Sequence, residues 1–204
     1  ITEMHTWMDT SDDTLGETTE ILNRLRDITV QASNGTYDSE QRQAIAKEVD
    51  QLKLQLVEVA NTKVNNKFIF NGVETTQKPV NVDGAGAITV NHGGYDDVML
   101  EVTAGTKANV DPTNVYSQDL FDDVEKLSAD LKDPNQTQFD NHISAIDNHI
   151  DNTVGERADL GARMNRVELI ESRLEGQQIT ARDMMSQNED ADIAEVIMNL
   201  TSQE

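Results

Sequence analysis

A heptad repeat of apolar side chains runs through residues 1–33 and constrains the fold more than any other feature of the sequence. A hydrophobic repeat of 3.5 residues predicts one long helix that buries two adjacent seams against partner helices. At 1.5 Å per residue this helix measures roughly 50 Å, and Asn34-Gly35 ends it because both residues tolerate the left-handed conformation. Seven of the ten seam positions are apolar, in a first seam of Ile1, Met8, Leu15, Leu22 and Thr29 and a second of Met4, Ser11, Thr18, Leu25 and Ala32.

A second helix is predicted from Asp38 or Ser39 to about Lys63. A short polar side chain at its start accepts the first free backbone N–H groups, and Gln41 completes a capping box. Since the loop between the two helices is short, they are expected to run antiparallel as a hairpin. Its apolar stripe at helical spacing consists of Ile45, Val49, Leu52, Leu56 and Val59.

Residues 67–114 are rich in Gly, Asn, Thr and Val in short alternating runs, and they predict a small β-rich insert domain. Turns are expected at 71–72, 83–86 and 92–94, where glycine follows a polar residue. A domain this small is marginal alone, so we expect it to lean on the helices or on neighbouring subunits. The predicted strands are residues 68–70, 80–82, 87–90 and 98–102.

Helical spacing returns at Leu120 and stops at Asp133-Pro134, because the residue before a proline disfavours helix. A long helix is predicted from Thr137 to Met185, although three internal glycines each cost roughly 1 kcal/mol relative to Ala. Asn188 to Asp192 offers caps for a separate terminal helix. The glycines are Gly155, Gly161 and Gly176, and the expected stripe is Ile143, Ile146, Ile150, Val154, Leu160, Met164, Val167, Leu174 and Ala181.

The predicted fold class is therefore mainly α with a small β insert. Stripes at the two ends of the chain are covered only if the ends pack side by side. We expect residues 1–66 and 115–204 to form one discontinuous rod domain, an elongated antiparallel helical bundle or coiled coil. Residues 67–114 form the β domain between its two parts.

The charge of the chain excludes two classes of partner. Asp and Glu number 38 against 16 Lys and Arg, which gives a net charge of −22. An acidic surface of this size repels phosphate backbones and anionic headgroups, so neither nucleic acid nor a membrane surface is an expected partner. There is no cysteine, so thiolate chemistry is excluded.

The sequence contains no motif that points to catalysis, and we expect a protein that is not an enzyme. Zinc-protease, nucleophile-elbow, P-loop and dinucleotide-binding patterns are all missing. His142 and His149 lie seven apart on a predicted helix, too far for a metal pair on one helix, and are expected on the surface with no assigned role. No catalytic residue, cofactor or metal site is expected.

Long stretches at both ends resemble the core helices of bacterial flagellins. At the N-terminal end they are Leu22–Thr36 (LNRLRDITVQASNGT), Ser39–Leu52 (SEQRQAIAKEVDQL) and Val57–Asn71 (VEVANTKVNNKFIFN). At the C-terminal end they are Arg157–Glu171 (RADLGARMNRVELIE) and Asn188–Glu195 (NEDADIAE). Within this family, Lys67–Gly72 and the helix at Asp119-Leu120-Phe121 are similar to the hook-associated protein 3 branch.

The resemblance implies an extracellular flagellar protein, exported through the flagellar secretion apparatus and placed at the hook-filament junction. Its implied partners are further copies of itself in a tubular ring, flagellin on the filament side, hook-associated protein 1 on the hook side, and an export chaperone. Family members carry further terminal segments that form an inner tube, so the chain is expected to be a core fragment that is monomeric in dilute solution.

The resemblance also selects five polar residues as candidate subunit contacts, although ordinary solvated helix polarity explains them equally well. Two other functions stay open. One is flagellin itself, and the other is a secreted coiled-coil tip or translocator protein, which also lacks cysteine and carries acidic helices. The candidate contacts are Arg24, Arg26, Gln31, Asn165 and Arg166.

Overall fold

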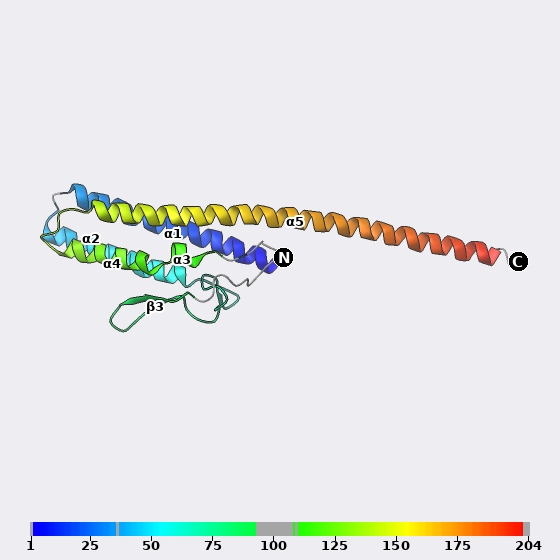
Figure 1. Cartoon of the computed structure of the whole chain (residues 1–204), viewed down its shortest axis with the longest axis horizontal. Helices are drawn as coiled ribbons and strands as arrows, with labels where there is room; N and C mark the ends of the chain where they lie inside the picture. Colours follow the sequence, from blue (N-terminus) through cyan, green and yellow to red (C-terminus); the bar gives the residue numbers. More distant parts are fainter. Residues whose placement is uncertain (1, 36, 93–107, 109, 202–204) are drawn as a thin grey trace. The chain divides into compact units, whose positions relative to one another are not determined.

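The computed structural model describes residues 2–35, 37–92, 108 and 110–201. The chain forms two compact units, residues 1–164 and 165–204. In the first unit, α1 (Thr2–Asn34), α2 (Ser39–Ala60), α4 (Gln118–Lys132) and the first part of α5 (Asp140–Thr201) make a helical bundle with two small sheets beside it (Figure 1). The second unit is the remainder of α5. The predicted fold class, mainly α with a small β part, is confirmed.

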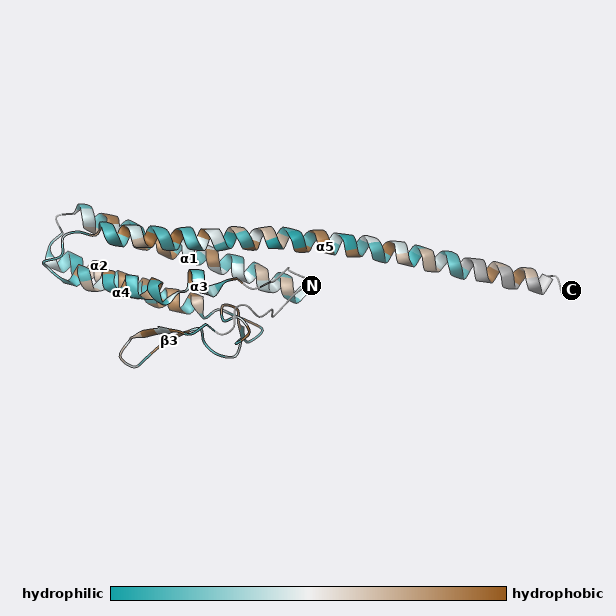
Figure 2. Ribbon diagram, viewed as in Figure 1, coloured by the Kyte–Doolittle hydropathy of each residue, from teal (hydrophilic) through white to brown (hydrophobic). Residues whose placement is uncertain are grey.

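Helix α1 buries the predicted heptad. Every described position of both seams is buried, with Met8, Leu15, Leu22 and Leu25 fully inaccessible. Ile1 lies outside the described residues. Figure 2 shows hydrophobic and hydrophilic residues alternating along the helices, as expected where one face of each helix is covered.

Helix α2 begins with the predicted capping box. The Asp38 side chain accepts from the backbone N–H of Gln41 at 2.8 Å, and the Gln41 side chain accepts from the backbone N–H of Asp38 at 3.1 Å. The helix ends at Ala60, three residues before the predicted end at Lys63. The reason lies at Asn61, whose side chain exchanges two hydrogen bonds with the backbone of Val80 and so ties the end of α2 to the insert.

The insert contains two antiparallel hairpins. Strand β1 (Lys63–Val64) pairs with β2 (Lys67–Phe68), and Asn65 and Asn66 turn between them with positive φ angles of 50° and 63°. Strand β3 (Val80–Val82) pairs with β4 (Ile88–Val90). Their loop is closed by the Asp83 carboxylate, which accepts from the backbone N–H groups of residues 85 and 87.

The strand predicted at 68–70 is wrong beyond Phe68, since Ile69 and Phe70 lie in a turn. All three side chains are buried, whereas a strand with one covered face would expose the middle one. Phe70 instead packs edge-on against Tyr116, with ring centroids 4.9 Å apart. The strand predicted at 98–102 lies outside the described residues.

The helices after the insert differ from prediction in two main respects. A short helix, α3 (Pro112–Val115), capped by Asp111, was not predicted. Helix α4 ends at the predicted proline boundary. Helix α5 begins at Asp140 and continues to Thr201 without a break, so the separate terminal helix predicted after Asn188 is wrong. Asn and Asp favour helix starts but do not prevent a helix from continuing, as proline does.

Candidate functional site

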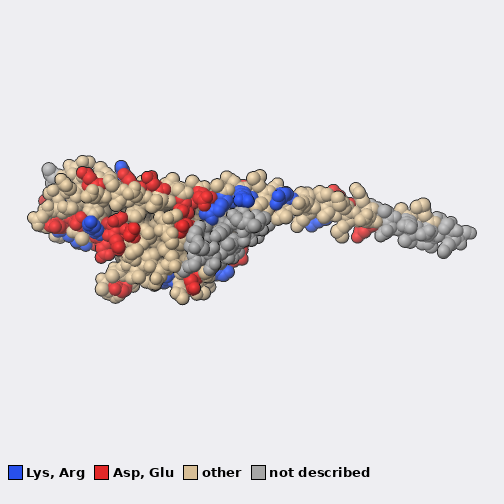
Figure 3. Space-filling view, viewed as in Figure 1, with Lys and Arg blue, Asp and Glu red and all other residues tan. Residues whose placement is uncertain are grey.

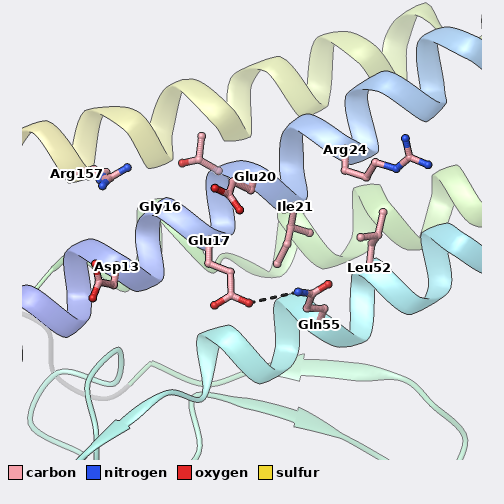
Figure 4. Close-up of a pocket in the computed structure, with 10 residues that line it drawn as sticks. Asp13, Gly16, Glu17, Glu20, Ile21, Arg24, Leu52, Gln55 and Arg157 are labelled. Carbon is pink, nitrogen blue, oxygen red and sulfur yellow. Dashed lines mark hydrogen bonds between the residues drawn. The ribbon is translucent and has the colours of Figure 1, made fainter.

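A groove of about 770 Å³ lies on the first unit between α1, α2 and α5 (Figure 4). One wall carries three exposed carboxylates, Asp13, Glu17 and Glu20. The Gln55 side-chain amide donates to Glu17 at 3.3 Å from the opposite side. The remaining lining residues are Gly16, Thr19, Ile21, Arg24, Leu52 and Arg157.

Arg157 closes one end of the groove by crossing α1 at Gly16. Its Nε and Nη2 donate to the two carboxylate oxygens of Asp12 at 2.8 and 2.9 Å. A Cβ atom at Gly16 would stand 3.2 Å from the guanidinium, so the missing side chain gives the arginine its space. The hydrogen bonds from Arg157 hold the pKa of Asp12 below its ordinary value.

Two predicted contact residues, Arg24 and Arg26, form ion pairs with other helices of the same chain. Arg24 lines the far end of the groove, and its Nη2 lies 2.6 Å from Glu48 on α2. The Nε of Arg26 donates to Asp147 on α5 at 2.6 Å. Each arginine therefore has an intrachain partner, and its role in subunit contact stays a prediction.

The other three predicted contact residues, Gln31, Asn165 and Arg166, are exposed. Gln31 shares α1 with Arg24 and Arg26, whereas Asn165 and Arg166 belong to the second unit. Three of the five predicted contact residues therefore lie on α1 in the first unit, and the other two lie in the second unit.

The two histidines expected on the surface are buried, which corrects that prediction. His142 and His149 are 7% and 8% exposed, and their Nε2 atoms lie 2.7 Å from Asp130 and Asp123 of α4. The buried face of α5 is offset from the predicted stripe and includes both histidines, while the stripe residue Val154 is 49% exposed. Histidine spacing around Ile146 could have revealed this face.

Sequence reasoning also missed Tyr116, which is fully buried. Its hydroxyl lies 2.7 Å from the Thr18 hydroxyl in the α1 seam, and burial raises the pKa of the phenol. A tyrosine between predicted elements carries no periodic signal, so nothing in the sequence marked it.

Within the described residues, no group of three or more His, Cys, Asp or Glu side chains is arranged to hold a metal ion. Over the same residues, no helix has the length and apolar character that crossing a membrane requires.

Comparison with known proteins identifies the architecture. The family model for the bacterial flagellin N-terminal helical region matches residues 5–75, and the model for the flagellin C-terminal helical region matches residues 143–204. These are the two ends that supply the long helices of the bundle. The chain belongs to the bacterial flagellin family.

Curated relatives of two kinds resemble the chain. Flagellar hook-associated protein 3 of Escherichia coli is 25% identical, with 92% of this chain and 68% of the relative covered. Flagellin of Bacillus subtilis is 30% identical, with 94% of this chain and 66% of the relative covered. The chain thus spans about two thirds of the length of these relatives.

Solved structures give the same fold. The crystal structure of Bacillus cereus FlgL superposes with a TM-score of 0.73 at 24% identity and covers 88% of each chain. That of flagellar hook-associated protein 3 from Legionella pneumophila superposes with a TM-score of 0.76 at 16% identity, covering 92% of this chain and 94% of the other. Flagellin of Bacillus cereus, also 24% identical, has a TM-score of 0.51, with 82% and 83% covered.

Proposed function

We propose that this chain is a structural subunit of the bacterial flagellum that joins hook to filament. A matched pair of structures from Bacillus cereus carries the proposal. At the same 24% identity, the fold agrees with FlgL at a TM-score of 0.73 and with flagellin at 0.51. Identity is equal in the two comparisons, so the difference lies in how the chain is folded. It supports the junction role over the filament role.

Assembly in this role takes place through contacts between chains and needs no chemical reaction. We propose self-association in a tubular ring, with flagellin on the filament side and hook-associated protein 1 on the hook side. An export chaperone and the flagellar secretion apparatus would deliver the subunit to its extracellular site. The groove described above is a shallow surface feature between helices, which suits docking of a protein segment. We propose that the chain is not an enzyme.

A gene deletion in the source bacterium tests the junction role. Loss of a junction subunit removes the surface on which the filament grows, so we expect hooks without filaments and flagellin released into the medium. Electron microscopy of cells and immunoblotting of the medium measure both. Hooks that still carry completed junctions, without any flagellin being released, would instead assign the chain as the filament subunit. The 30% identity to Bacillus subtilis flagellin is the observation that favours this second candidate.

A further inference from the structure

We propose that the groove bounded by Asp13, Glu17 and Glu20 binds the Arg166–Arg173 stretch of α5 from a second copy of this chain. The inference rests on the proposed function, because it concerns how neighbouring subunits of one assembly touch. One copy contributes the groove, and the other contributes an exposed face of α5, so the two surfaces are different.

The groove presents carboxylates and apolar side chains next to one another. Asp13, Glu17 and Glu20 are spaced four and three apart on α1, so they share one helix face and span about 10 Å along it. Ile21, which is only 4% exposed, and Leu52 also line the groove and supply apolar surface. Figure 4 shows the carboxylates along the wall, with Glu17 reaching toward Gln55.

The cations at the two ends of the groove are already engaged within the chain. Arg24 pairs with Glu48, and Arg157 pairs with Asp12 and also attracts Asp13. Among the described residues, Glu20 has no ion-pair partner. The wall therefore retains negative charge that an incoming cation can neutralise.

The second unit carries the matching pattern. Arg166, Leu169 and Arg173 are spaced three and four apart, so they lie on one face of α5 and the two arginines are about 10 Å apart. All three are exposed, Leu169 by 73%. Within the described part of the chain neither arginine has an ion-pair partner.

Charge along the chain favours this stretch as the occupant. Residues 163–182 contain four arginines against three glutamates, in a chain whose net charge is −22. Figure 3 shows acidic side chains spread over the bundle and basic ones gathered along part of α5. Two arginines with a leucine between them match a groove lined by carboxylates and apolar side chains. Burial of apolar area adds affinity, and ion pairs set the register of the contact.

The geometry of the contact fits a ring. A groove on one copy and a helix face on the next are different surfaces, so the contact is heterologous and leaves a free groove and a free helix at the two ends. Such contacts repeat from copy to copy and close only when the rotation returns to the first subunit. A tubular junction requires this kind of repetition.

Site-specific cross-linking tests the contact, and the absence of native cysteine makes it clean. Cells would express two single-cysteine copies together, one carrying Glu20→Cys and the other Leu169→Cys. Mild oxidation of isolated flagella then joins the two copies if the surfaces meet. The matched control replaces Leu169→Cys by Glu168→Cys, which is also exposed but points about 100° away around the helix.

We expect a cross-linked pair with Leu169→Cys and at least several-fold less with Glu168→Cys. Adding Glu17→Arg to the first copy should abolish the product, and Arg166→Glu with Arg173→Glu in the second copy should restore it. Equal products with both cysteines, or a product insensitive to the charge reversal, overturns the groove contact. Immunoblotting of the isolated flagella distinguishes failure of the groove contact from failure of the proposed function. If the chain is missing from the flagella, the proposed function itself is contradicted. Circular dichroism confirms that each variant is folded.

Discussion

Hydroxyl side chains occupy three buried seam positions of α1, Ser11, Thr18 and Thr29. Each donates to the backbone carbonyl four residues earlier, at 2.6 to 2.9 Å. A buried hydroxyl is costly only when it lacks a partner, so these bonds make a polar residue compatible with a packed seam. The seams of the heptad are therefore packed without a gap, although three of their positions carry polar side chains.

The bond between Thr18 and Tyr116 gives the first prediction. Both side chains are fully buried, and the two hydroxyls lie 2.7 Å apart. Tyr116→Phe and Thr18→Val should each lower the free energy of unfolding by about 1 kcal/mol. The double variant should lose less than the sum, because the second change removes a partner already lost. Urea unfolding measures all four proteins, and strictly additive losses would contradict the hydrogen bond.

The pair of Asp12 and Arg157 predicts a pH dependence. The pKa of Asp12 is held below its ordinary value of 3.8 in the folded state. Its contribution is therefore complete above that value and is lost as the pH falls through the lowered folded pKa. Asp12→Asn should cost up to about 1 kcal/mol near neutral pH, because the pair is partly exposed.

This deficit should shrink as the pH falls through the lowered folded pKa of Asp12, because the parent carboxylate then becomes protonated as well. Thermal unfolding of both proteins across this range measures it. A deficit that stays constant in acid would show that Asp12 acts through packing and not through its charge.

At the scale of the elements, the periodic spacing of apolar side chains predicted the helices well. The surroundings of single polar residues were predicted poorly. The boundaries of α1 and the capping box of α2 follow from local rules about seams and caps, so they could be read from sequence. The burial of His142 and His149 could not, because it depends on carboxylates of α4 that approach from another part of the chain. The same holds for the groove, whose walls come from three helices.

The histidine pairs between α4 and α5 give a prediction at the scale of the elements. His142→Ala removes a buried imidazole that bonds Asp130 and packs near Phe139. We expect a loss of about 1 to 3 kcal/mol in the free energy of unfolding, and a similar loss for His149→Ala. The control is Asn148→Ala, an exposed position on the same helix that should change little. If both losses were as small as that of Asn148→Ala, the burial of the two histidines against α4 would be contradicted.

The glycines inside helices behave in two ways. A Cβ atom at Gly155 meets nothing within 4 Å, whereas one at Gly16 stands 3.2 Å from Arg157. Gly155→Ala should therefore stabilise the protein by roughly 1 kcal/mol through helix propensity alone. Gly16→Ala should gain less, because the guanidinium must shift. Chemical denaturation compares the two, and an equal gain would contradict a close approach at Gly16.

At the scale of the whole molecule, family membership and function rest on different observations. The two family matches cover the chain ends that form the long helices. The junction role is a proposal, which is supported by similarity to hook-associated protein 3 of Escherichia coli and by agreement of the fold with FlgL structures. Sequence identity alone does not separate the two roles, since flagellins and hook-associated protein 3 are matched at 25% to 30%.

The location of the protein on intact flagella tests the junction role most directly. Purified flagella would be labelled with antibody to this chain and gold particles, and the particles located by electron microscopy. We predict label confined to the boundary between hook and filament. Label along the full length of the filament would contradict the junction role.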